Sequence, residues 1–138
     1  MSFKTKISLA AVVALLLVYG AYFLWASRPG HSGPEIFVHM VGAAILLAVL
    51  MIALAATIAV LDVLVARSGG VVDERDRANE LRGVRNGYYA LAGLIWLAPF
   101  IALAGASPLL LANLCLGVLV LAEIIHFGSR VAYDLLGV

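Results

Sequence analysis

Four long apolar runs constrain this sequence more than any other feature, and they cover residues 7–26, 36–66, 88–106 and 108–128. Each reaches the roughly 20 residues that a helix needs to cross the hydrocarbon core of a bilayer. The runs are continuous and lack the strict alternation of a membrane β-barrel strand. Because 64% of the 138 residues are apolar and 12% are charged, a water-soluble fold of this size cannot bury the hydrocarbon. We predict one domain over residues 1–138, an all-α integral membrane four-helix bundle.

The distribution of Lys and Arg at the two ends of the apolar runs indicates how the bundle is oriented in the membrane. Arg28 is the single Lys or Arg between the first two runs, and the turn between the last two has none. The other eight collect at the opposite side of the predicted bundle: Lys4, Lys6, Arg67, Arg75, Arg77, Arg82, Arg85 and Arg130. Cytoplasmic loops carry the excess of Lys and Arg. We therefore expect a multi-pass protein of a prokaryotic cytoplasmic membrane, with both termini and the charged segment 67–87 in the cytoplasm.

Aromatic residues agree with that orientation, since Tyr and Trp favour the membrane interfaces. The outer interface is expected to hold Tyr22, Trp25 and Phe37, and the inner one Tyr88, Tyr89 and Tyr133. Trp96 falls near mid-span, where Pro99 is expected to kink the helix. We expect Trp96 to pack in the core of the bent bundle.

The segment 71–89 balances four acids against four arginines. Asp73 is suited to cap a new helix after the break at Gly69 and Gly70. Leu81, Val84 and Tyr88 then recur at helical spacing and continue into the third run. This pattern predicts a cytoplasmic helical extension between spans two and three, which Gly83 and Gly87 weaken.

The charged segment is our first candidate site. It leads to the hypothesis of a non-enzymatic protein that binds a cytoplasmic partner through Asp73, Glu74, Arg75, Asp76, Arg77 and Glu80. Arg82 and Arg85 lie nearer the membrane, which suits the headgroups of anionic lipids. No Walker loop, nucleophile elbow or HExxH motif indicates an enzyme. A net charge of +1 gives no basic face for direct contact with nucleic acid.

The second candidate site is an intramembrane polar cluster, because ionisable groups in a bilayer are costly and mark function. Its expected members are Asp62, Arg82, Arg85, Glu123, His126 and Arg130. The simpler interpretation is that Glu123 pairs with Arg82, Arg85 or Arg130 and fixes the charged helix to the bundle. The alternative is a small proton- or cation-coupled transporter, or an accessory subunit of a membrane complex, centred on Glu123.

No cofactor or metal centre is predicted. His39 and His126 differ in depth by roughly 20 Å at about 1.5 Å per residue, which excludes them as the two axial ligands of one haem. His31 and His39 give at most a weak surface metal site. Cys115 lies inside an apolar run and is expected to be a packing residue.

Three short stretches, DERDR (73–77), RNGYYAL (85–91) and AEII (122–125), resemble a prokaryotic family of small membrane proteins, domain of unknown function 2178. His126 departs from the family pattern, where a basic or polar residue is expected. The resemblance implies a membrane tether or sensor for a helix-turn-helix regulator, and it implies no catalytic residues. Small multidrug transporters carry an essential Glu in their first helix, whereas the first run here has no acid. Small residues in the second run, including Gly42 and Ala43, are compatible with a homodimer.

Overall fold

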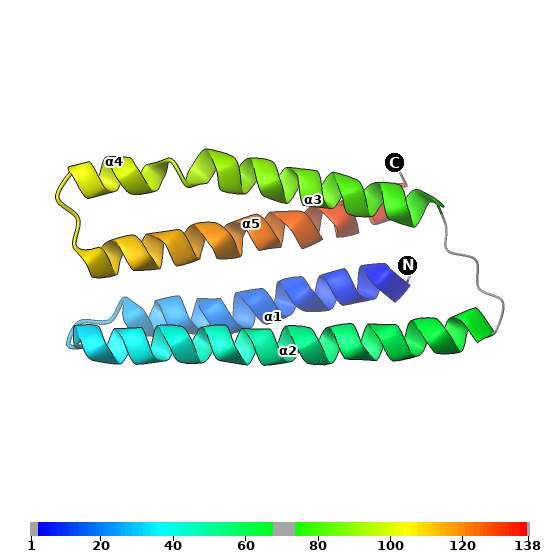
Figure 1. Ribbon diagram of the computed structural model, residues 1–138, viewed down its shortest axis with the longest axis horizontal. Coiled ribbons are helices and arrows are strands. Elements are labelled where there is room, and N and C mark those ends of the chain that lie inside the picture. The colour runs from blue at the N-terminus through cyan, green and yellow to red at the C-terminus, as the bar shows by residue number, and fades with distance from the viewer. Residues whose placement is uncertain (1–2, 68–73, 138) are drawn as a thin grey trace.

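The chain folds into long helices laid side by side in a computed structural model that describes residues 3–67 and 74–137 (Figure 1). The described helices are α1 (Phe3–Ala26), α2 (Gly33–Arg67), α3 (Glu74–Leu94), α4 (Leu97–Leu103) and α5 (Pro108–Leu136). Four segments are long and apolar enough to cross a membrane: Thr5–Ala26, Gly33–Thr57, Arg77–Leu103 and Pro108–Leu136. The predicted all-α architecture with four spans is thus confirmed for the described residues.

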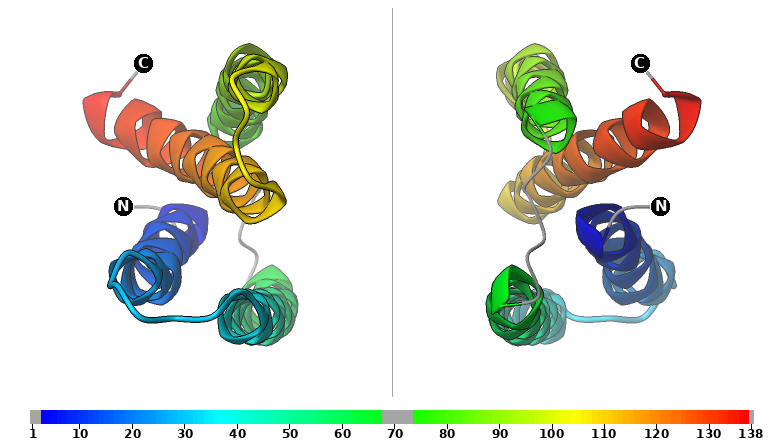
Figure 2. Two further views of the ribbon diagram at one scale, coloured as in Figure 1. Left: turned by 90° about the vertical axis from the view of Figure 1, so that its left-hand side faces the viewer. Right: turned by 90° about the vertical axis from the view of Figure 1, so that its right-hand side faces the viewer.

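Helix α5 holds the bundle together. It packs against α3, α1 and α4, whereas α2 packs mainly on α1. Seen along the bundle, α5 lies between the arm formed by α3 and α4 and the hairpin formed by α1 and α2 (Figure 2). The buried core joins Leu15, Tyr19 and Tyr22 of α1 to Val120 of α5.

Tyr22 faces the core of the bundle. It is 5% exposed, and its hydroxyl donates a hydrogen bond to Oδ1 of Asn113 on α5. Because the amide oxygen satisfies the phenol inside the bundle, the ring need not reach water.

A capping box begins α2. The Ser32 N–H donates to Oε2 of Glu35 (3.0 Å), and the Glu35 N–H donates to the Ser32 hydroxyl oxygen (3.4 Å). This reciprocal pair satisfies two of the free N–H groups of a helix start. The helix consequently begins at Gly33, ahead of the apolar run, and its 35 residues span roughly 52 Å, well beyond the hydrocarbon thickness.

The predicted helical extension and the first part of the third span form one helix, α3, and α4 continues the span after a break. Helix α3 begins at Glu74, directly after the expected cap Asp73, which lies outside the described residues, as do Gly69 and Gly70. The helix stops at Leu94 because Pro99 has no N–H for the Ile95 carbonyl and its ring would clash there. Instead, the Ala98 N–H donates to the Ile95 oxygen (3.1 Å) and closes a tighter turn.

Trp96 lies in this break, and the prediction that it packs in the core is wrong. It is 66% exposed, since the break leaves its ring on the outside of the bundle. Pro99 breaks the helix, as predicted, but the break turns the indole outwards.

The two ends of the bundle are made of different parts of the chain. One end, called here the terminal end, holds the first residues of α1 and α3 and the last residues of α2 and α5 (Figure 1). The other, called the turn end, holds the connections from α1 to α2 and from α4 to α5. Of the described cations, Arg28 alone lies at the turn end.

Candidate functional site at the terminal end of α3 and α5

Two glycines bring α3 unusually close to α5. A Cβ atom added at Gly83 would lie 2.8 Å from the His126 carbonyl oxygen, and one at Gly87 would lie 2.7 Å from the His126 Cβ. Real Cβ atoms do not approach this closely, so any side chain would push the helices apart. Gly83 and Gly87 form the Gly-x-x-x-Gly spacing that lets membrane helices associate through backbone contact. The spacing is visible in the sequence, and its effect is to bring two helices together as well as to lower the helix propensity of α3.

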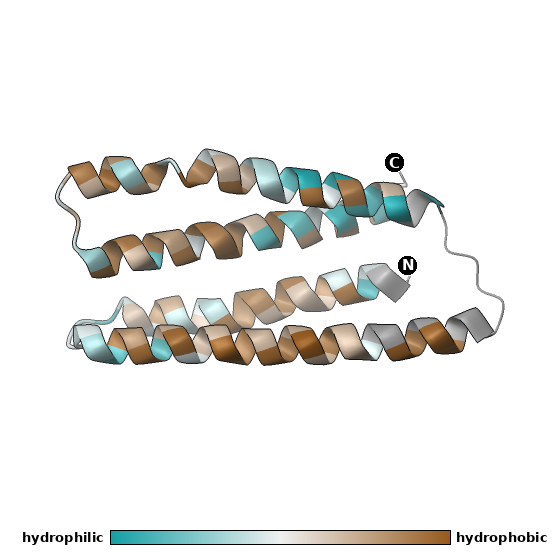
Figure 3. Cartoon of the chain, in the orientation of Figure 1, coloured by the Kyte–Doolittle hydropathy of each residue, from teal (hydrophilic) through white to brown (hydrophobic). Residues whose placement is uncertain are grey.

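Hydrophilic residues gather on α3 and α5 toward the terminal end (Figure 3). Nη2 of Arg130 lies 3.7 Å from Oε2 of Glu80, so an ion pair joins α5 to α3. The Asn86 amide donates to the Tyr133 hydroxyl (3.0 Å). The guanidinium of Arg82 lies 5.5 Å from the centre of the Tyr133 ring, within cation–π range. We call these five residues, Glu80, Arg82, Asn86, Arg130 and Tyr133, the polar seam.

Helix α1 joins α5 at the same end. The Thr5 hydroxyl donates to Oδ2 of Asp134, and Thr5 and Ser8 are each 1% exposed. Hydrogen bonds between helices can stabilise a membrane bundle by about 1 kcal/mol each. The terminal end is therefore fixed by side-chain polar contacts, whereas the middle of the bundle is fixed by apolar packing.

Asn79 is the unusual member of the α3–α5 contact. It lies one turn before Gly83 and is 1% exposed, yet neither its Nδ2 nor its Oδ1 has a hydrogen-bond partner among the described residues. A buried polar group left unpaired costs about 1–3 kcal/mol. The unpaired Asn79 amide therefore destabilises the α3–α5 contact, whereas the polar seam beside it stabilises this contact.

Glu123 does not make the expected contact with an arginine. Its side chain is 55% exposed, and Oε2 lies 3.2 Å from Nδ1 of His126 on its own helix. Among the described side chains, no arginine is its partner. The reason is the glycine contact, which places α3 over Ala122 and His126 and leaves Glu123 beside the interface.

The predicted intramembrane cluster thus separates into parts. Arg82 and Arg130 belong to the polar seam, while Glu123 and His126 form a pair at its edge. Arg85 is exposed. The side chain of Asp62, on α2, lies outside the described residues.

The predicted partner-binding residues also divide. Glu74 and Arg77 are exposed, whereas Glu80 is engaged by Arg130. Asp73 and the side chains of Arg75 and Asp76 lie outside the described part of the chain.

The predicted apolar stripe of α3 faces away from α5. Leu81 and Tyr88 are each 65% exposed and Val84 is 50% exposed. Arg77 and Arg85 are exposed beside them. We call these five residues the outer face of α3, because Asn79, Gly83 and Gly87 occupy the buried face.

No group of three or more His, Cys, Asp or Glu side chains within residues 3–67 and 74–137 is placed to hold a metal ion. Cys115 is partly buried. The described residues of the site thus offer charge pairs and an exposed amphipathic surface.

Comparison with protein-family models, curated proteins and solved structures finds no match to this chain. The resemblance to the domain of unknown function 2178 family accordingly stays a prediction, and the functional argument depends on the geometry.

The glycine contact can be tested with one residue pair on α3. Gly87→Ala should destabilise the bundle by about 1–3 kcal/mol, the usual cost of overpacking, despite the better helix propensity of alanine. Gly93→Ala is the matched control, because an added Cβ there meets nothing within 4 Å; it should be neutral or stabilising by up to about 1 kcal/mol. Unfolding in detergent by chemical denaturant measures both. Equal effects of the two substitutions would contradict the close α3–α5 contact.

Proposed function

We propose that this chain is a non-enzymatic, multi-pass protein of a prokaryotic cytoplasmic membrane whose outer face of α3 binds a cytoplasmic protein partner. Both termini lie in the cytoplasm in this proposal. The observation that carries it is the outward exposure of Leu81 and Val84 between Arg77 and Arg85.

Depth supports a partner over lipid for the first part of this face. Counting about 20 residues of membrane-spanning helix back from Leu103, the end of α4, reaches the neighbourhood of Val84. Leu81 and Arg77 then stand outside the hydrocarbon core. Leu81 and Val84 together form an exposed apolar patch bordered by charged groups, which is typical of a protein-binding surface.

The contacts behind the outer face support the same role. Glu80 and Asn86 hold α3 to Arg130 and Tyr133 of α5, so the face is presented on an anchored helix. A partner helix or groove could engage such a surface by its apolar side chains, with acids opposite the two arginines. The family resemblance suggests a helix-turn-helix regulator as the partner, with the membrane protein as its tether or as a sensor of membrane state.

The transporter alternative centred on Glu123 has weaker support. A coupling carboxylate should lie in an enclosed polar site shared by several helices. Glu123 is more than half exposed, and its described partner, His126, comes from the same helix.

The orientation predicts which cysteines a membrane-impermeant maleimide reaches in intact cells. With Cys115→Ser as background, Ser27→Cys at the turn end should be labelled from outside. Leu136→Cys at the terminal end should be labelled only after the membrane is opened. Labelling of Leu136→Cys in intact cells, with protection of Ser27→Cys, would reverse the proposed topology.

The binding surface predicts a position-specific crosslink. A photoreactive amino acid at Leu81 should give an adduct with a soluble protein in intact cells. At Leu103, which is 86% exposed but lies at the turn end, it should not. Because the two arginines flank the apolar stripe, Arg77→Glu with Arg85→Glu should remove most of the Leu81 adduct, while Arg28→Glu should leave it unchanged. An adduct that survives the double reversal would place the partner elsewhere.

A further inference from the structure

The charged side chains around the α3–α5 contact are divided between its two sides. Glu80 and Arg82 are two residues apart, roughly 200° around a helix, so they lie on opposite sides of the buried glycine face of α3. Their contacts agree with this, because Glu80 lies 3.7 Å from Arg130, whereas Arg82 lies over the ring of Tyr133. The contact therefore has an Arg130 side and a Tyr133 side.

The other described acids of α3 and α5 lie away from Arg82. Glu123 precedes Arg130 by about two turns and shares its side of α5. Asp134 accepts a hydrogen bond from α1, so it is directed toward that helix. Glu74 stands eight residues before Arg82, roughly 12 Å along α3. Among the described residues, no acid forms an ion pair with Arg82.

Two arginines consequently stand together on the Tyr133 side without a neutralising acid. Arg82 and Arg85 are three residues apart, which makes them neighbours on the helix surface. Both are exposed, and Arg85 also lacks an ion pair with any residue that the structure describes. A guanidinium placed over an aromatic ring uses its flat face and keeps the N–H groups in its plane for other partners. Arg82 is thus held beside Tyr133 with its donors unused.

The Tyr133 hydroxyl adds a further donor. It accepts a hydrogen bond from the Asn86 amide (3.0 Å), and within the described part of the chain its own hydrogen has no acceptor. An arginine contributes five N–H donors and no acceptor. The Tyr133 side therefore offers hydrogen-bond donors and positive charge together. A ligand that matches it is an anion with several acceptor oxygens.

The level of these residues in the membrane indicates the source of the anion. The hydrocarbon core begins near Val84 by the count given above, so Arg82 and Arg85 lie within about 3 Å of that boundary. The headgroup layer occupies roughly the next 5–8 Å outwards. Tyr88 and Tyr89, which are 65% and 64% exposed, follow about one turn further in, as is typical of interfacial tyrosines. A lipid phosphate of this leaflet is therefore within reach of both arginines.

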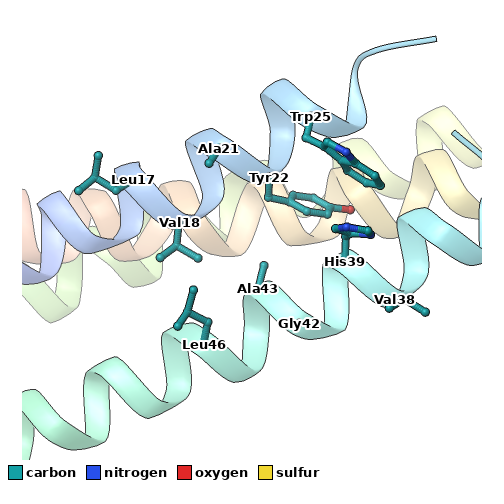
Figure 4. A pocket seen from close by; sticks show the side chains of 10 residues that line it. All are labelled: Leu17, Val18, Ala21, Tyr22, Trp25, Val38, His39, Gly42, Ala43 and Leu46. Carbon is teal, nitrogen blue, oxygen red and sulfur yellow. The ribbon is translucent and has the colours of Figure 1, made fainter. Parts of the chain in front are cut away.

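The largest described cavity, between α1 and α2, lacks such a group of cations. It has a volume of about 640 Å³, and Figure 4 shows Val18 and Leu46 facing one another across it, with Trp25 and His39 together at its end. Its described lining residues include no Lys, Arg, Asp or Glu. This cavity can contact lipid chains without selecting a headgroup, so Trp25 is a suitable reference for the Tyr133 side.

We propose that Arg82, Arg85 and Tyr133 form a binding site for the headgroup of an anionic phospholipid in the leaflet at the terminal end. The phosphate oxygens accept hydrogen bonds from the two guanidinium groups and from the tyrosine hydroxyl. The acyl chains descend past Tyr89. Arg85 also borders the outer face of α3, but Arg82 and Tyr133 do not belong to that face. Tests on Arg82 therefore separate this site from the proposed partner surface.

Fluorescence quenching by brominated lipid tests the site directly. The chain contains two Trp residues, so Tyr89→Trp in a Trp25→Phe, Trp96→Phe background places the sole tryptophan one turn from Arg85. The protein is reconstituted in phosphatidylcholine vesicles with a minor fraction of chain-brominated phosphatidylglycerol or chain-brominated phosphatidylcholine. The relative binding constant should be at least about fivefold higher for phosphatidylglycerol, the effect of one arginine near an anionic surface. Native Trp25, as the sole tryptophan of Trp96→Phe, should be quenched equally by the two lipids.

Three substitutions in the Tyr89→Trp reporter distinguish a defined site from diffuse attraction to the surface. Arg82→Gln should lower the preference for phosphatidylglycerol about fivefold. Arg77→Gln is the matched control, because Arg77 is also exposed but stands roughly 7.5 Å further out along α3; it should retain the preference at physiological salt. Arg82→Lys keeps the charge but loses the planar group that lies over Tyr133 and binds phosphate with two N–H groups, so it should lose part of the preference.

The proposal would be overturned by equal binding of the two lipids at the reporter, or by a preference that survives Arg82→Gln. Equal losses in Arg82→Gln and Arg77→Gln, or full retention in Arg82→Lys, would show diffuse attraction in place of a site. Millimolar inorganic phosphate should leave the quenching by brominated phosphatidylglycerol unchanged. Displacement of the lipid by inorganic phosphate would instead assign the site to a soluble phosphate compound.

Discussion

The close approach of α3 to α5 at Gly83 and Gly87 is the constraint from which the rest of the terminal end follows. Lipid tails are as apolar as leucine, so membrane helices gain little from hiding apolar side chains against one another. Backbone contact and interhelical hydrogen bonds must supply the association instead. With no Cβ at these two positions, α3 lies against His126, and Glu80 and Asn86 come within reach of Arg130 and Tyr133.

That contact also decides which side of α3 is free. Asn79, Gly83 and Gly87 occupy one face at four-residue spacing, so Leu81, Val84 and Tyr88 must face away from α5. The proposed binding surface is thus a consequence of the packing, because the same helix cannot bury its glycines and its apolar stripe together. Helix α5 stands at the centre, with α3 held by glycine contact and polar pairs and α1 held by apolar packing around Leu15 and Tyr19.

The architecture could be predicted from the sequence because the length of a membrane-spanning apolar run is set by the thickness of the hydrocarbon core. Sequence reasoning also found the helix over 74–94 and the effect of Pro99, which are local consequences of charge, spacing and a missing N–H.

Sequence reasoning could not place Trp96 or Tyr22, since whether an aromatic ring faces lipid or core depends on the rotation of its helix. The partner of Glu123 was mistaken for a related reason. Several arginines lie at a depth from which they could reach Glu123. The contact at Gly83 fixes the rotation of α3 about its axis, and with that rotation none of the arginines whose side chains are described contacts Glu123. In the sequence, the Gly-x-x-x-Gly spacing of Gly83 and Gly87 is the signal for that rotation.

The face of α3 that meets α5 can be measured by engineered cysteine pairs in a Cys115→Ser background. A Cβ at Gly83 would lie 3.3 Å from the Cβ of Arg130, within a few tenths of an ångström of the roughly 3.5–4.5 Å found in disulfides. A cysteine at Gly83 must also relieve the 2.8 Å contact of its Cβ with the His126 carbonyl oxygen, and a shift of several tenths of an ångström brings the two Cβ atoms into the disulfide range. Gly83→Cys with Arg130→Cys should therefore crosslink under mild oxidation in membranes. Val84→Cys with Arg130→Cys should not, because Val84 lies on the outer face. Crosslinking of the Val84 pair in preference to the Gly83 pair would show that α3 is rotated and that its apolar stripe, not its glycines, meets α5.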